Sequence, residues 1–220
     1  MGLHLAGFDV VGVDILPLNV QPGLFEPPRD WYPFEFRQGD ALKADLRGFD
    51  LIWASPPCQR YSSATRQSGN QNDHPDLVEP VRAMLIASGV PYVIENVVGA
   101  PLIDPVMLCG SMFGLRVIRH RLFEASFPIV DLPEHRHDGS LVTGEYVTVA
   151  GNGGVPAWTY KEREARGLPR YMPDEMDLET WKAAMGIDWN MSREGVVQAI
   201  PPTYSEFIGR AALAAMERAA

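Results

Sequence analysis

The chain has 220 residues, a formal net charge of −9 and a sequence pI of about 5.0. With 46% hydrophobic and 21% charged residues, its composition is typical of a folded globular protein and excludes an intrinsically disordered one. No apolar run approaches the roughly 18 residues of a membrane-spanning helix, and the acidic balance argues against a protein that coats nucleic acid by bulk charge.

The start of the chain, MGLHLAGFDV, lacks the basic region and the long apolar stretch of a secretory signal. The two cysteines, Cys58 and Cys109, are too few for a disulfide framework. These features predict a cytoplasmic protein with free thiols and no membrane contact.

Strand and helix patterns alternate in the N-terminal half. Apolar residues at helical spacing predict a helix over His74–Gly89, with Pro75 in its first turn and Pro80 where a proline can bend it. Long apolar runs predict buried parallel strands at Phe8–Ile15, Phe34–Asp40, Phe49–Pro57 and Val90–Val97. This order predicts an open α/β sheet with right-handed crossovers.

The second half of the sequence is less regular. Residues 125–175 hold many Pro, Gly and His residues and one predicted strand, Tyr146–Gly151. We expect residues 1–124 and 181–220 to form one domain and residues 125–180 a small irregular insertion. Helical patterns return over residues 177–186, over residues 192–200 and from Pro202 onward.

The beginning of the chain departs from a common pattern. A doubly wound nucleotide-binding fold opens with a strand, a glycine-rich turn and a helix before its acid-tipped second strand. Only seven residues precede Phe8–Ile15, which ends just after Asp14, so the chain begins as though inside that first helix. The predicted fold is therefore a doubly wound, mostly parallel sheet without its first strand and without the glycine loop.

Polar and reactive side chains follow the predicted strands. Cys58 comes just past Phe49–Pro57, on a turn stiffened by two prolines, where an open α/β sheet binds its ligands. Glu95 and Asn96 end the neighbouring strand at the same edge, and a carboxyl in an apolar strand end is costly unless it is paired or used. The alternatives are a structural cysteine after a tight turn and a carboxyl that caps a nearby loop.

Arg119 and Arg121 stand two residues apart, so on a strand both face one side. The alternative is an exposed strand edge with two solvated arginines. A thiol, a carboxyl and paired arginines in this order at strand ends favour a catalytic site over three independent structural roles.

These motifs resemble those of the DNA (cytosine-5)-methyltransferases. The resemblance rests on PPCQ at 56–59 followed by Tyr61-Ser62, on ENV at 95–97 and on RHR at 119–121. It extends to AGFDVVGVD before Ile15, to QGD at 38–40 and to GVVQAIPPTYSEFIG at 195–209, and covers most of residues 5–124 and 181–213. Val117 stands where the family has Gln, and the family's glycine loop is not in this sequence.

The resemblance implies a fold of the S-adenosylmethionine-dependent methyltransferase type and transfer of a methyl group to C5 of a flipped-out cytosine in DNA. Cys58 would add to C6 of the base and Glu95 would bind its N3 edge. Arg121 would bind its O2 atom, and Arg119 would support Glu95 or the loop.

The cofactor implied is S-adenosylmethionine, and no metal is expected, because the five histidines show no metal-ligand spacing and His135 and His137 look like loop residues. The partner implied is double-stranded DNA, bound by a monomer in a bacterial or phage-infected cell, with a role in restriction-modification. The implied cofactor residues are Asp14, Ile15, Asp40, Ala41, Pro56, Leu77, Gln198 and Ala199. The implied DNA contacts are Gln59, Arg60 and Ser62.

Two further segments are candidates for DNA recognition. Tyr146–Gly154 is a candidate by position alone. The basic residues Lys161, Arg163, Arg166 and Arg170 form either a DNA-facing stretch or an exposed charged helix interleaved with Glu162 and Glu164, and the second interpretation is slightly favoured.

Alternative functions remain open at this point. A truncated family member would bind DNA with little or no catalysis. A nucleotide-binding or redox domain would carry a glycine-rich phosphate loop or a CxxC motif, and the sequence has neither. A purely structural protein leaves the thiol, the carboxyl and the two arginines unexplained.

Overall fold

Strands and helices alternate in the computed structural model of the chain, which describes residues 1–16, 32–149, 157–170 and 177–219. The strands are β1 (Val11–Asp14), β2 (Glu35–Gln38), β3 (Ile52–Ala54), β4 (Tyr92–Asn96), β5 (Val106–Leu108) and β6 (Arg121–Ala125). The helices are α1 (Gly2–Ala6), α2 (Ser63–Ser68), α3 (Val78–Ser88), α4 (Ala157–Ala165), α5 (Leu178–Met185), α6 (Arg193–Gln198) and α7 (Pro202–Ala219).

The strands form two sheets. The parallel pair β1-β2 stands apart from a four-stranded sheet of order β3-β4-β6-β5, in which β3 and β4 are parallel. Strand β6 runs antiparallel to both β4 and β5. The α/β class is therefore confirmed. Strands β3, β4 and β5 run in one direction, so the larger sheet is mostly parallel, and only β6 is reversed within it.

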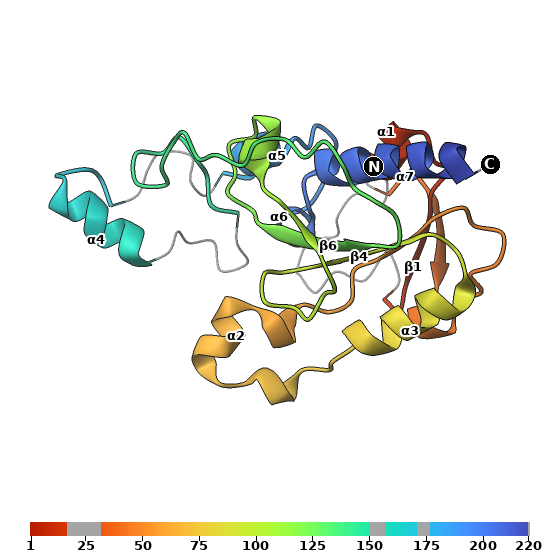
Figure 1. Cartoon of the computed structure of the whole chain (residues 1–220). Helices are drawn as coiled ribbons and strands as arrows, with labels where there is room; N and C mark the ends of the chain where they lie inside the picture. The colour runs from red at the N-terminus through yellow and green to blue at the C-terminus, as the bar shows by residue number, and fades with distance from the viewer. Residues whose placement is uncertain (17–31, 150–156, 171–176, 220) are drawn as a thin grey trace.

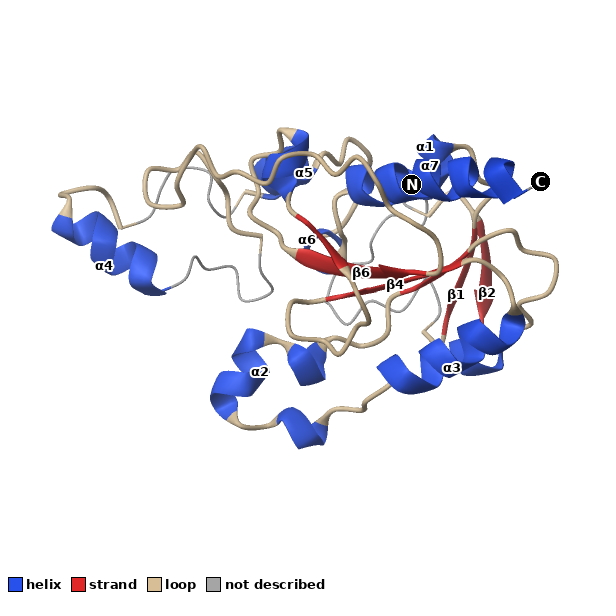
Figure 2. Cartoon of the chain, in the orientation of Figure 1, coloured by secondary structure: helices blue, strands red, loops and turns tan. Residues whose placement is uncertain are grey.

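Helices cover both faces of the larger sheet (Figures 1 and 2). On one face lie α1 and α7, and Ile208 of α7 is fully buried against Val93 and Phe123 of the sheet. On the other face lies α3, whose Leu85 is fully buried against Ile94. Each helix buries the apolar stripe that its sequence period predicts, so the sheet is enclosed from both sides.

Helix α1 lies at the start of the chain, where the sequence predicts helix. It packs along α7, and this close approach requires glycine at position 2, because a Cβ there would lie 2.0 Å from the carbonyl oxygen of Pro202. Helix α3 begins at Val78, three residues after the expected Pro75, so Pro80 falls within its first turn. A proline in the first turn removes no intrahelical hydrogen bond, and no bend is needed.

The predicted strand Tyr146–Gly151 is wrong for the residues that the structure describes. Val147 forms only an isolated parallel bridge with Val117, and positions 150 and 151 lie outside the described residues. Val147 and Val149 instead pack into a second small core with Trp181 of α5 and Val196 of α6.

Helix α4 lies at the far end of the molecule from α7 (Figure 1). Among the described helices none is long and apolar enough to cross a membrane.

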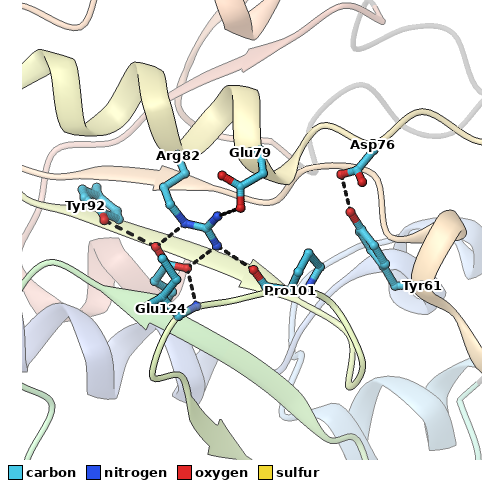
Figure 3. A network of polar contacts seen from close by, with 8 residues as sticks. Tyr61, Asp76, Glu79, Arg82, Tyr92, Pro101 and Glu124 are labelled. Atoms are coloured by element: carbon cyan, nitrogen blue, oxygen red, sulfur yellow. Dashed lines mark hydrogen bonds and ion pairs between the residues drawn. The ribbon is translucent and has the colours of Figure 1, made fainter.

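A buried ion pair ties α3 to the sheet (Figure 3). The guanidinium of Arg82 donates to both carboxylate oxygens of Glu124 on β6, at 2.8 and 2.7 Å, and to the carbonyl of Pro101 at 2.7 Å. Burial alone would raise the pKa of Glu124, but hydrogen bonds from Arg82 and from the Ile103 N–H hold it below its ordinary value. Because both side chains are about 95% buried, each charge depends on the other.

We predict that Arg82→Met lowers the free energy of unfolding by about 3–5 kcal/mol, because it leaves the Glu124 carboxylate buried without its partner. Urea unfolding at neutral pH measures the change. The control is Arg210→Met, which breaks an exposed pair with Glu206 on α7 and should cost no more than about 1 kcal/mol. Equal losses in the two variants would contradict this account.

Candidate active site

The loop after β3 carries Cys58, the side chain proposed above as a nucleophile. Strand β3 ends at Ala54, and the loop passes through buried Pro56 to a partly exposed Cys58. The side-chain amide of Asn96, at the end of β4, donates to the carbonyl of Pro56 at 2.9 Å. This buried hydrogen bond fixes the backbone next to Cys58 to the neighbouring strand, where the two strands end side by side.

The far side of the same loop is fixed by Arg60 and Tyr61. The Tyr61 hydroxyl donates to Asp76 (Figure 3), and burial together with this hydrogen bond raises the pKa of Tyr61 to about 12. The guanidinium of Arg60 donates to the carbonyls of Gln71 and His74, both at 3.2 Å. Hydrogen bonds thus fix the backbone on both sides of Cys58, and its side chain stays partly exposed to solvent.

Glu95 and Arg121 meet at the same edge of the sheet. Glu95 lies on β4 and Arg121 begins β6, its antiparallel neighbour, and Arg121 Nε stands 3.2 Å from Glu95 Oε1. Burial raises the pKa of Glu95 above its ordinary value, while Arg121, a hydrogen bond from Ser55 and the charge of Arg119 act in the opposite direction. The net effect is a carboxyl that holds its proton more tightly than an exposed one.

Arg119 lies just before β6 and points into the protein. Its guanidinium donates to the carbonyls of Val149 at 3.2 Å and Val197 at 2.5 Å, so it links the second small core to the site. Burial and the charge of Arg121 lower its pKa to about 9, and Glu95 and Cys58 act on it in the opposite direction. Its Nε atom is buried and has no hydrogen-bond partner in the described part of the chain.

These side chains form one constellation. A thiol, a carboxyl and two guanidinium groups lie around the carboxyl ends of β3 and β4 and the start of β6, as the sequence predicts. The expectation that Arg119 and Arg121 share a strand face is wrong, since β6 begins only at Arg121. Chemically, the set offers a nucleophile, a proton donor and a cation that can bind an oxygen atom.

The two predicted acidic cofactor residues lie at the ends of the parallel pair. Asp14 closes β1, its carboxylate accepts from the Leu16 N–H at 2.9 Å, and the adjacent Ile15 is 67% exposed. Asp40 follows β2 and caps the turn that begins at Ala41 by accepting from the Leu42 N–H at 3.1 Å. Both carboxylates and an apolar side chain are therefore accessible at one edge of this sheet.

The other predicted cofactor residues come from three elements. Pro56 is buried in the Cys58 loop, Leu77 precedes α3, and Gln198 and Ala199 lie at the end of α6, with Gln198 exposed. Their convergence on one ligand stays a prediction.

Of the predicted DNA contacts, Gln59 is exposed, whereas Arg60 and Ser62 already have partners within the chain. The Ser62 hydroxyl caps α2 by accepting from the Thr65 N–H at 3.1 Å. Arg60 binds the two carbonyls described above. Contact of these residues with phosphate stays a prediction.

The basic stretch in α4 is not a uniform surface. Arg163 is fully buried and donates to the carbonyls of Leu141 and Val142, so neither the DNA-facing interpretation nor the exposed-helix interpretation holds for it. Arg166 pairs with Glu162 at 2.7 Å, as the charged-helix interpretation predicts. Lys161 is exposed, and Arg170 stacks on the ring of Tyr160. Part of the other candidate segment, Tyr146–Gly154, lies outside the described residues.

One group of side chains was missed from the sequence. Cys109 and three histidines, His120, His135 and His137, converge at one place although they come from three separate segments. The available signals were the HxH spacing at 135–137 and an isolated cysteine at 109, neither of which indicates by itself where the other ligands lie.

Comparisons with known proteins add no relative. A scan against protein-family models finds no matching family, and a search of curated proteins finds no match.

We predict that Glu95→Gln stabilises the protein relative to the parent chain at neutral pH. Because the folded-state pKa of Glu95 is raised, the parent loses stability as the pH rises from its ordinary value of 4.5 through the folded-state value. The stability difference between the two proteins should therefore be small at acidic pH, grow across this window and then level off. Urea unfolding over a pH series measures it, and a difference that shrinks as the pH rises would contradict it.

Proposed function

We propose that the chain transfers a methyl group from S-adenosylmethionine to C5 of a cytosine that has been flipped out of double-stranded DNA. The observation that carries this proposal is a partly exposed Cys58 on a loop that Asn96 ties to the end of β4, where the buried Glu95 pairs with Arg121. A structural pair alone would not require a partly exposed thiol on an anchored loop at the same sheet edge.

Cytosine C5 is a poor nucleophile, and the first task is to activate it. The Cys58 thiolate adds to C6, the C5=C6 bond opens, and its electron pair moves onto C5 and toward N3. Glu95 donates its proton to N3 as the adduct forms, for which a raised pKa is well suited. Arg121 binds the O2 atom and stabilises the charge that develops there.

The second task is to alkylate C5 and restore the ring. When bound, S-adenosylmethionine would supply an electrophilic methyl group to C5 and leave as S-adenosylhomocysteine. As C5 takes the methyl group, the C4=N3 bond re-forms and the N3 proton returns to Glu95. A base then removes the C5 proton, the C5=C6 bond re-forms, and Cys58 leaves as a thiolate. Arg119 acts as a positioning residue, because its hydrogen bonds to Val149 and Val197 hold the segment from which Arg121 extends.

The residues at the end of β1 fit the cofactor. Exposed carboxylates such as those of Asp14 and Asp40 can accept hydrogen bonds from ribose hydroxyls and an adenine amino group. The exposed side chain of Ile15, next to Asp14, offers an apolar surface for the adenine ring.

The strand order also supports this fold. In a doubly wound sheet the first strand lies between the second and the fourth. If β1, β2 and β3 are the second, third and fourth strands, a sheet without its first strand consists of the pair β1-β2 and a separate sheet that begins at β3. This is the observed division into two sheets.

We predict that DNA containing 5-fluorocytosine forms a stable covalent adduct with the protein in the presence of S-adenosylmethionine. Fluorine at C5 cannot leave as a proton does, so turnover stops after methyl transfer with Cys58 still attached to C6. Denaturing electrophoresis detects the adduct, and mass spectrometry of the digested complex locates the modified peptide.

The matched control for trapping is Cys58→Ala, which should form no adduct and transfer no methyl group. DNA with ordinary cytosine should be methylated but not trapped. An adduct on the peptide that contains Cys109, or methyl transfer by Cys58→Ala, would contradict the proposed mechanism.

We predict that Asp14→Ala weakens binding of S-adenosylhomocysteine by about tenfold or more, since a hydrogen bond to a charged group contributes about 1.5–3 kcal/mol. Isothermal titration calorimetry measures the dissociation constant. Asp45→Ala, an exposed carboxylate paired with Arg47, is the control and should bind as the parent does. Failure of the parent chain to bind at all would favour the alternative of a DNA-binding protein with little catalysis.

A further inference from the structure

A thiol and three imidazoles converge outside the proposed active site. The Sγ atom of Cys109 and one ring nitrogen from each of His120, His135 and His137 all lie within 4.8 Å of one another. Cys109 follows β5 and is fully buried, His120 precedes β6 and is partly buried, and the other two lie exposed on the loop after β6.

The spacing within this cluster is that of ligands around a single ion. The Nε2 atoms of His120 and His135 are 3.2 Å apart, those of His135 and His137 are 3.1 Å apart, and Cys109 Sγ is 3.4 Å from His137 Nε2. A tetrahedral zinc ion with Zn–N of about 2.0–2.1 Å and Zn–S of about 2.3 Å would separate its ligand atoms by about 3.3–3.6 Å. Small side-chain adjustments would therefore admit the ion.

Hydrogen bonding explains the convergence less well than a cation does. The Nε2 atom of His135 is close to two other Nε2 atoms but has only one in-plane position, which holds either a proton or a lone pair. It cannot make good hydrogen bonds to both neighbours at once. A cation at the centre accepts one lone pair from each ring and satisfies all of them together.

We propose that Cys109, His120, His135 and His137 bind one zinc ion in a closed tetrahedral site. Cysteine thiolate and neutral imidazole are both ligand types that zinc binds tetrahedrally, whereas magnesium and calcium prefer oxygen ligands. Four protein ligands leave no position for substrate, so the ion is structural. Binding releases the Cys109 proton to solvent, because only the thiolate coordinates zinc.

The site links the segments that shape the proposed active centre. His120 stands between Arg119 and Arg121, so a bound ion fixes the backbone from which both guanidinium groups extend. The backbone at Gly110 passes close to this segment, since a Cβ there would lie 2.2 Å from the carbonyl oxygen of Val117. The ion would join the segments next to β5 and β6 to the loop that follows β6.

The inference does not depend on the proposed function, because none of the four ligands is assigned a role in methyl transfer. The test is metal analysis of the full chain, expressed with added zinc and dialysed against metal-free buffer. We expect about one zinc ion per chain by inductively coupled plasma mass spectrometry. Replacement by cobalt(II) should give the visible bands of a tetrahedral ion and a near-ultraviolet band from thiolate to cobalt.

Variants separate the ligands from other residues. Cys109→Ser should abolish the thiolate band, and His135→Gln or His137→Gln should lower zinc affinity at least about tenfold. The two histidines are exposed, so these variants keep the core intact if Cys109→Ser fails to fold. Cys58→Ser and His74→Gln, which change a cysteine and a histidine outside the cluster, should keep full zinc content. A folded parent chain without zinc, or full zinc affinity in the double variant His135→Gln/His137→Gln, would overturn the proposal.

Discussion

The proposed active site depends on the contact between Glu95 and Arg121 across β4 and β6. A carboxyl that is only 11% exposed at the end of an apolar strand is costly, and the guanidinium 3.2 Å away offsets part of that cost without removing it. In the proposed mechanism, the same contact orients the Glu95 carboxyl that donates a proton to N3 and the Arg121 guanidinium that binds O2. Strand β6 must run antiparallel beside β4 for this pair to form, so the mixed topology of the sheet and the chemistry of the site have one origin. By contrast, the buried pair of Arg82 on α3 and Glu124 on β6 is joined by two parallel hydrogen bonds, as is typical of a structural ion pair.

Much of this arrangement follows from the sequence. Apolar runs that end in Asp14, in Pro56-Pro57 and in Glu95-Asn96 predict buried strands with functional groups at their ends, and β1, β3 and β4 lie within those runs. The predicted burial holds for β4 alone, because β3 is partly buried and β1 is partly buried to exposed. The strand at Tyr146–Gly151 could not be excluded in this way, because its β-branched residues suit a strand and a packed loop equally well. Val147 and Val149 pack against α5 and α6 without a partner strand, and that packing depends on distant residues.

The role of individual charges was harder to predict. Arg163 looks like its neighbours in the sequence of α4, yet it is fully buried among backbone carbonyls, which only the fold of residues 141–142 could reveal. The four residues of the proposed zinc site could not be grouped from the sequence either, because they come from separate segments that meet only when β6 pairs antiparallel with β5. In this account the zinc site and the Arg119 hydrogen bonds hold one segment from two sides, and Arg121 extends from that segment toward Glu95.

The central claim is that Cys58, Glu95 and Arg121 bind one and the same cytosine. The most direct measurement is a crystal structure of the protein covalently trapped on DNA that contains 5-fluorocytosine. The account predicts a bond from Cys58 Sγ to C6, with Glu95 within hydrogen-bond distance of N3 and Arg121 within hydrogen-bond distance of O2. A base held at the sulfur with its N3 and O2 atoms turned away from Glu95 and Arg121, or held elsewhere on the protein, would contradict it.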